Sequence, residues 1–165
     1  MRYDYCPKCG GRLGLGKYQD ENKPQCEHCG FIFYQNPIVG VAAIVLRDQK
    51  ILLGRRVGSY EGKWCIFCGY VEWDEDVYDA VKREFQEETG IHIEVERVYK
   101  VLSNFHNPKQ HTVGIWFLAK EIGGESRAGD DLDALGFFHY DSIPPLAFPT
   151  DRVVLDKLKK EGLLE

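Results

Sequence analysis

The stretch that decides the fold runs from Gly69 to Ile91 and reads G-Y-V-E-W-D-E-D-V-Y-D-A-V-K-R-E-F-Q-E-E-T-G-I. Its second half predicts a helix in which side chains three and four positions apart share one face. Glu84 and Glu88 fall within the apolar arc of that helix, beside Phe85. Unpaired like charges are costly to bury, so these carboxylates predict a bound divalent cation, which prefers oxygen ligands.

The same stretch resembles the Nudix box, in which a Gly, five residues, a Glu and seven residues precede Arg-Glu-aliphatic-x-Glu-Glu-x-Gly-aliphatic. Ile91 fills the last apolar position, and Phe85 is aromatic where an aliphatic residue is commoner. The fixed charged and glycine positions are filled by Gly69, Glu75, Arg83, Glu84, Glu87, Glu88 and Gly90. So many fixed positions make this match far more specific than a lone glycine motif.

The resemblance covers roughly residues 37–160 and implies an α/β fold, a Nudix α/β/α sandwich around a mixed β-sheet. The order of apolar segments agrees, because strands interleave with two helices. The resemblance also implies hydrolysis of a nucleoside diphosphate linked to another group. A pyrophosphate is anionic and repels a nucleophile, so Mg²⁺ or Mn²⁺ is expected to neutralise charge and acidify the attacking water.

The resemblance assigns catalytic roles to residues of the box. Glu84 and Glu88 are the first choices as Mg²⁺ or Mn²⁺ ligands, and Glu87 would bind a second ion or water. Cys68 would contribute its backbone carbonyl, as the residue just before the box does in the family. Arg83 is expected to pair with a carboxylate and fix its direction.

The general base is expected in the acidic loop over residues 123–133, or else at Glu87. In Nudix enzymes the base often lies on a late loop, and homologues commonly carry Glu where this chain has Asp133. The shorter side chain of Asp133 reaches less far, and for any one of these loop acids a solvated residue is the better explanation. The loop candidates are Glu125, Asp130, Asp131 and Asp133.

Arg55 and Arg56 are the candidate substrate-binding residues. They close a predicted strand, so one would reach a phosphate and the other would turn to solvent. Tyr34, Phe105 and Trp116 could stack on a base, although at least two of them are expected in the core. His106 and His111 are interpreted as structural residues.

The cysteines form C-x-x-C pairs, and two of the pairs predict a zinc site. Four thiolates in paired knuckles, each followed by glycine, suit tetrahedral Zn²⁺ and resemble a zinc ribbon over residues 1–35. The predicted zinc ligands are Cys6, Cys9, Cys26 and Cys29. Cys65 and Cys68 lie in a predicted strand, where side chains alternate, so we expect buried packing rather than a knuckle.

Asn36-Pro37 marks the boundary, and residues 36–165 form the predicted Nudix hydrolase domain. A helix is predicted from about residue 75 to 89, capped by Asp74 and ended by Gly90, with Glu75 as a structural residue of its first turn. A final helix would be capped by Thr150 or Asp151. The predicted strands span residues 38–46, 50–56, 95–105, 112–121 and 137–140, and another enters Gly69.

The net charge and the lack of long apolar segments restrict the kinds of binding partner that we expect. The 165 residues carry a net charge of −5, which argues against broad binding of nucleic acid or of an anionic membrane. No apolar run approaches the roughly 20 residues that span a bilayer, and the first residues lack an apolar signal core. The expectation is a cytoplasmic protein that acts on a small nucleotide. The ribbon has few aliphatic residues, which makes a homodimer a further hypothesis.

The expected substrate is an adenosine dinucleotide or nucleotide sugar: FAD, ADP-ribose or NADH. Ribbon-bearing NADH pyrophosphatases carry Ser-Gln-Pro-Trp-Pro-Phe beyond the box, and this signature is absent from residues 102–108. The tail over residues 137–148 looks like that of ribbon-bearing enzymes acting on FAD or ADP-ribose. The alternative is a binding module whose ribbon docks nucleic acid or protein on a Nudix scaffold. The intact acidic cluster of the box argues against that alternative.

Overall fold

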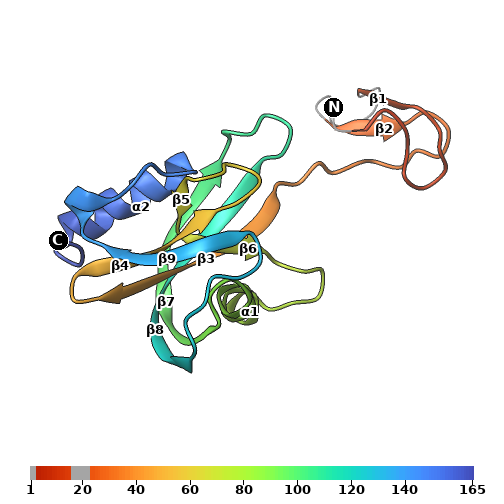
Figure 1. Ribbon diagram of the computed structural model, residues 1–165. Helices are drawn as coiled ribbons and strands as arrows, with labels where there is room; N and C mark the ends of the chain where they lie inside the picture. The colour runs from red at the N-terminus through yellow and green to blue at the C-terminus, as the bar shows by residue number, and fades with distance from the viewer. Residues whose placement is uncertain (1–2, 16–22) are drawn as a thin grey trace. The chain divides into compact units, whose positions relative to one another are not determined.

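The computed structural model describes residues 3–15 and 23–165, and the chain divides between Pro37 and Ile38 into two compact units (Figure 1). In the smaller unit, β1 (Leu13–Leu15) pairs antiparallel with β2 (Pro24–Cys26). Its core is small, with Cys6, Leu13 and Cys26 buried and two phenylalanines packed against them. So few apolar side chains predict that this unit needs a further stabilising element.

The larger unit is built around β3 (Ile38–Arg47), which has different partners along its two edges. One edge runs parallel to β8 (Thr112–Gly124), and the other pairs first with β6 (Phe67–Tyr70) and then with β4 (Lys50–Arg56). The remaining strands are β5 (Trp64–Cys65), β7 (Ile91–Asn104) and β9 (Leu132–Phe138). Parallel and antiparallel pairs together make the sheet mixed, as predicted.

Two helices, α1 (Val77–Thr89) and α2 (Pro149–Lys160), cover opposite faces of this sheet (Figure 1). Because side chains alternate along β3, Val41 and Ala43 pack on the α1 side, whereas Ala42 and Ile44 pack on the α2 side. The predicted α/β/α sandwich is therefore confirmed.

The start of each helix differs from the prediction. α1 begins two residues later than expected, and Asp76 caps it by accepting a hydrogen bond from the amide of Tyr78 at 2.8 Å. Asp74 is therefore not the cap. α2 begins at Pro149, after Phe148, whose side chain has no acceptor for a cap. The predicted caps Thr150 and Asp151 lie inside the helix, and the carboxylate of Asp151 accepts from the amide of Ile66. The end of α1 at Gly90, with a left-handed φ of 71°, agrees with the prediction.

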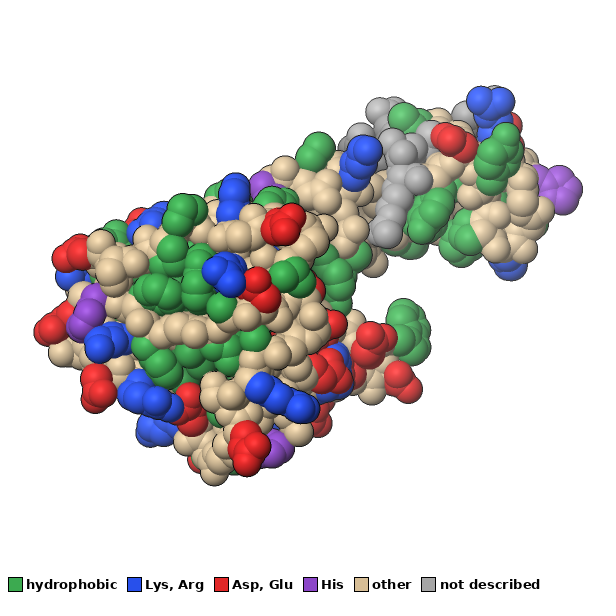
Figure 2. Space-filling view, in the orientation of Figure 1, with side chains coloured by type: hydrophobic (Ala, Val, Ile, Leu, Met, Phe, Trp, Pro, Cys, Tyr) green, Lys and Arg blue, Asp and Glu red, His purple; other side chains and the backbone are tan. Residues whose placement is uncertain are grey.

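Two strands also depart from their predicted bounds. β7 begins at Ile91, directly after the helix, and β9 begins at Leu132, inside the stretch expected to be a loop. Tyr140 lies in a short 3₁₀ helix (Tyr140–Ser142) rather than in a strand. No helix of the described residues has the length and apolar character needed to cross a bilayer. On the face seen in Figure 2, acidic and basic side chains are interspersed rather than separated by sign.

Candidate active site

A cavity of about 530 Å³ opens in the larger unit, where β3 lies between β6 and β8. Acids from α1 and from the loop before β9 line one side of it. Trp116 and Asp151 line another part, and rings of three loops stand at its rim. This volume is in the usual range for a site that encloses a small molecule.

The acidic face of α1 contains a buried carboxylate with an unsatisfied oxygen. Glu88 is 2% exposed, and its Oε2 atom has no hydrogen-bond partner among the described residues. Burial raises the pKa of Glu88 well above its usual range, and the charges of Asp131 and Glu84 raise it further. A buried carboxylate oxygen without a donor, close to other acids, fits the donor set of a hard divalent cation.

Glu84 lies against the backbone of β6 at Gly69. A Cβ atom at this glycine would lie 1.9 Å from Cδ of Glu84, so only glycine leaves room for the carboxylate. Burial raises the pKa of Glu84, while the guanidinium of Arg83 opposes that rise. Cys68, whose carbonyl was predicted to be a metal ligand, lines the same cavity.

Arg83 connects the carboxylates of the Nudix box. It donates to both oxygens of Glu75 at 2.7 and 2.8 Å, to Glu84 at 2.8 Å and to Glu87 at 3.2 Å. The first of these pairs lowers the pKa of Glu75 to about 2. Glu75 was expected in the first turn of α1, but it precedes the helix, and its bidentate pair ties the preceding loop to Arg83.

The structure does not bring Glu87 to the cavity. Its side chain is 56% exposed and pairs with Arg83 on the outer side of the helix. Its predicted roles, as a ligand of a second ion or water and as an alternative base, stay predictions.

Among the loop acids, the structure brings Asp131 to the cavity. It pairs with Arg56, and its Oδ1 atom is buried without a partner in the described part of the chain. Asp130, in the left-handed region with a φ of 51°, lines the cavity beside it. Asp133 and Glu125 do not line the cavity.

The two arginines that end β4 point in different directions. Arg56 lines the cavity, where it donates to the carbonyl of Ser59 at 3.1 Å and lies over the ring of Phe148. Arg55 lies outside the cavity and pairs through two hydrogen bonds, at 2.7 and 3.0 Å, with Asp133. Strand alternation therefore separates them, and of the two only Arg56 lines the cavity.

An aromatic group at the rim was missed by sequence reasoning. The rings of Tyr60 and His106 stand 5.2 and 5.7 Å from that of Phe148, and all three line the cavity. They come from separate loops, so no local pattern links them. His106 was interpreted as structural, but it lines the cavity. The expectation that at least two of Tyr34, Phe105 and Trp116 lie in the core is wrong, because Tyr34 and Phe105 are 60% and 66% exposed and only Trp116 is buried.

Asp151 was also missed, because its place near a helix start suggested a cap. It is 2% exposed, and it accepts a hydrogen bond from the amide of Ile66 at 3.0 Å. Burial raises the pKa of Asp151 to about 7, while the Ile66 amide and the nearby indole of Trp116 oppose the rise.

Cys65 and Cys68 lie on opposite faces of the sheet. Cys65 packs in the core on the α1 side, whereas Cys68 packs on the α2 side. Burial raises the pKa of both thiols, that of Cys65 to about 12. Two neutral thiols on opposite faces are suited to packing, as the sequence indicated, and not to joint metal binding.

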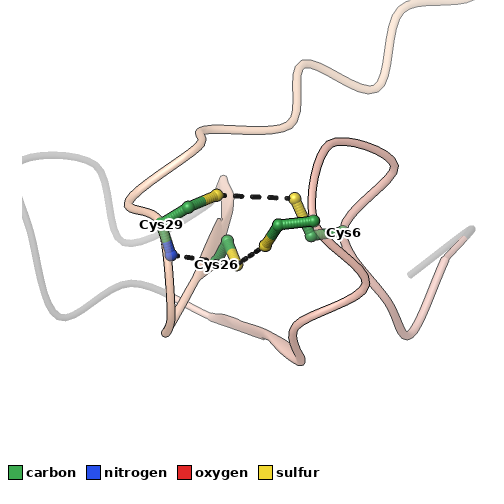
Figure 3. A group of neighbouring side chains, drawn as sticks. Cys6, Cys26 and Cys29 are labelled. Carbon is green, nitrogen blue, oxygen red and sulfur yellow. Dashed lines mark hydrogen bonds between the residues drawn. The ribbon is translucent and has the colours of Figure 1, made fainter.

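The smaller unit brings its cysteines together (Figure 3). The thiols of Cys6, Cys9, Cys26 and Cys29 all lie within 4.8 Å of one another. Cys6 is 3.8 Å from Cys29, and Cys9 is 3.5 Å from Cys26. The edge of a sulfur tetrahedron around Zn²⁺ is about 3.8 Å, given a Zn–S distance of about 2.3 Å.

Backbone groups support thiolate ligands at this cluster. The amides of Lys8 and Cys29 donate to the sulfurs of Cys6 and Cys26, respectively. The Cys29 amide is the main reason that the pKa of Cys26 is lowered to about 6. A Cβ atom at Gly11 would lie 3.0 Å from that sulfur, so glycine keeps the cluster compact. The site fits zinc by both spacing and donor chemistry.

A mixed sheet between two helices, with a cavity that Glu84 and Glu88 line, is consistent with the Nudix fold that the sequence predicted. The chain belongs to the Nudix family, because the family model described as the NUDIX domain matches residues 36–158. The resemblance noted in the sequence is thereby confirmed, and the chain is a Nudix hydrolase of the pyrophosphatase kind.

Individual relatives agree with this assignment. An ADP-ribose pyrophosphatase of Methanocaldococcus jannaschii is 37% identical over 128 residues, 76% of each chain. The NAD-capped RNA hydrolase NudC of Pseudomonas aeruginosa is 30% identical, and the match spans 86% of this chain but only 50% of that enzyme. Among solved structures, a NUDIX hydrolase from Nitrosomonas europaea covers 96% of this chain with a TM-score of 0.83 and 29% identity, and 92% of that chain is covered.

Proposed function

We propose that this enzyme uses Mg²⁺ or Mn²⁺ to hydrolyse the pyrophosphate bond of an adenosine dinucleotide or nucleotide sugar, such as ADP-ribose, FAD or NADH. The observation that carries the proposal is the orphaned Oε2 atom of Glu88, buried at a cavity that Glu84 and Arg56 also line. The similarity to an ADP-ribose pyrophosphatase and to NudC supports this substrate class.

Glu84, Glu88 and the carbonyl of Cys68 would hold the cation, which supplies charge neutralisation and a more acidic water when bound. Arg83 holds the carboxylate of Glu84 in one direction through its 2.8 Å hydrogen bond. The same guanidinium is fixed by Glu75, so the orientation of the ligand does not depend on substrate.

Arg56 would bind a phosphate group of the substrate, and Asp131, its ion-pair partner, would accept a proton from water. A phosphate group offers Arg56 a second anionic partner, and so competes with Asp131 for the guanidinium. The carboxylate of Asp131 already has one buried oxygen without a donor, and this Oδ1 atom can accept a proton from water. Of the predicted candidates, Asp131 is therefore our choice of general base.

The rim fits an aromatic base. Tyr60, His106 and Phe148 line the cavity, and the first two are also exposed to solvent, so planar groups can stack on their rings. A substrate with its pyrophosphate among the acids would extend a sugar and a base toward these rings. A bare phosphate ester would leave them unused.

The proposed function is tested by measuring hydrolysis of a panel of substrates with Mg²⁺ and with EDTA. The panel is ADP-ribose, FAD, NADH, diadenosine polyphosphates and dNTPs. We expect cation-dependent release of AMP from at least one of the first three, with a higher kcat/KM than for any dNTP. A preference for dNTPs would contradict the proposed substrate class. No hydrolysis of any member would favour the alternative of a binding module.

A structural zinc ion is expected in the smaller unit, distinct from the catalytic cation. Elemental analysis of protein purified under reducing conditions should find about one zinc per chain, retained after mild EDTA treatment that removes Mg²⁺. Cys26→Ser should lose the metal, because it removes one of the four clustered thiols. Cys65→Ser is the matched control and should keep it. Zinc-free wild-type protein would contradict the prediction.

A further inference from the structure

One part of the cavity carries polar groups that the catalytic roles above do not use. Trp116, on β8, is 5% exposed, and its indole Nε1 atom has no hydrogen-bond partner among the described residues. Its ring lies across Gly114, where an added Cβ atom would be 2.6 Å from the ring. The absence of a side chain at Gly114 therefore sets the position of the indole at the cavity.

Asp151, from the first turn of α2, faces the same part of the cavity. It is 2% exposed, and the Ile66 amide that binds its Oδ2 atom at 3.0 Å fixes the carboxyl group. The indole of Trp116 acts on the carboxyl group of Asp151 as a hydrogen-bond donor and lowers its pKa, but the contact is not well enough aligned to satisfy the Nε1 atom. A buried donor and a buried acceptor thus lie close together with bonding capacity left over.

We propose that Trp116 and Asp151 bind a hydroxyl group of the sugar that adjoins the substrate's pyrophosphate. A hydroxyl can accept from the indole and donate to the carboxylate through one oxygen atom. A phosphate suits the pair less well, because its oxygens are repelled by Asp151 whenever that carboxyl group is ionised. An apolar group would leave both buried partners unsatisfied.

The position of Trp116 and Asp151 in the cavity favours the sugar of the nucleotide, rather than its base, as the group that they bind. The charge of Arg56, the proposed phosphate-binding residue, acts on Asp151, and both residues line the cavity. The subsite therefore adjoins the expected position of the pyrophosphate, whereas the rings of Tyr60 and His106 are exposed to solvent. The inference rests on the proposed function, because it assumes a nucleotide in this cavity.

The subsite should distinguish a ribose from a deoxyribose. When a buried polar group loses its partner, binding weakens by roughly 10- to 100-fold. The enzyme should therefore discriminate against a ligand that lacks the hydroxyl group, because the buried indole and carboxyl group would lose their partner.

The experiment is calorimetric binding of AMP and ribose 5-phosphate, each beside its deoxy counterparts, to the full chain. For at least one of the two ligands, wild-type protein should bind a deoxy form roughly 10- to 100-fold more weakly. In Trp116→Phe and Asp151→Asn this difference should shrink to less than about threefold, because the hydroxyl-bearing ligand alone loses affinity. Asn keeps an acceptor for the Ile66 amide, so Asp151→Asn preserves that contact.

Trp64→Phe and Asp156→Asn are the matched controls, because both residues lie outside the cavity, and they should keep the wild-type preference. If one subsite variant fails to fold, the other still decides the result. The inference is wrong if wild-type protein shows no hydroxyl preference, or if the preference survives in a folded subsite variant. A hydroxyl preference in a protein that hydrolyses none of the panel would overturn the proposed function alone.

Discussion

Glu88→Gln is expected to abolish turnover while leaving the fold at least as stable as in the wild type. The substitution keeps the volume of the side chain but removes a charge that is buried beside Asp131 and Glu84. Activity should fall by at least about 100-fold, because both cation binding and water activation depend on this carboxylate. In EDTA the variant should melt no lower than the wild type, whereas in Mg²⁺ it should lack the stabilisation that cation binding gives.

The same variant should also remove a pH dependence of stability. Glu88 has a raised pKa in the folded protein, so between the unfolded value of about 4.3 and that raised value the folded state binds more protons. Stability of the metal-free wild type should therefore fall as pH rises above about 4.3. Melting curves in EDTA should show that the melting temperature of Glu88→Gln rises relative to that of the wild type as the pH increases across this range.

Glu94→Gln, an exposed change on β7, is the control and should resemble the wild type in activity and melting. Near-normal turnover in Glu88→Gln would mean that the metal site has been placed on the wrong residues. A variant that melts well below the wild type in EDTA would contradict the interpretation that the buried charge is destabilising.

Gly69→Ala should inactivate the enzyme with little effect on its stability. The new Cβ atom would lie 1.9 Å from Cδ of Glu84, at the far end of a flexible side chain, so the carboxylate would move rather than the strand. We expect activity to fall by about 100-fold or more, since a displaced ligand loses its geometry for the cation. The measurements are kcat/KM and the rise in melting temperature on adding Mg²⁺.

A double-mutant cycle shows whether Gly69 acts through Glu84. Glu84→Ala removes the carboxylate, so adding Gly69→Ala to it should cause no further loss of Mg²⁺-dependent stabilisation or residual activity. Additive losses would show that the methyl group blocks the substrate or disturbs β6 directly. A fully active Gly69→Ala enzyme would contradict the assignment of Glu84 as a ligand.

Most of the fold could be predicted, because its signals are local. The continuous apolar run that becomes β3, the spacing of acids on α1 and the glycine that ends this helix each depend on neighbouring residues. The helix starts were less certain, since Asp74 and Asp76 both suit a cap and only tertiary contacts decide between them. Asp151 shows the same limit, because a distant amide at Ile66 takes its carboxylate.

The site could be predicted in part. The box identified Glu84 and Glu88, whose spacing on one helix is fixed by geometry. The rest depends on loops far apart in the sequence, and no pattern shows that Tyr60, His106 and Phe148 meet. The sequence offered several loop acids as bases and aligned only Asp133 with the Glu of homologues. Which acid reaches the cavity depends on the pairing of β9 with β4.

Two adjacent ion pairs join the end of β4 to acids on either side of Leu132, where β9 begins, and make the spacing from Asp131 to Asp133 intolerant of change. The outer pair of Arg55 with Asp133 holds the start of β9, while Arg56 holds Asp131 two residues earlier. A one-residue deletion at Leu132 would leave the arginines unable to engage both acids at once. Among relatives, substitutions and length changes that alter substrate preference should therefore accumulate in the rim loops around Tyr60 and His106. A change of length in these loops displaces no catalytic acid.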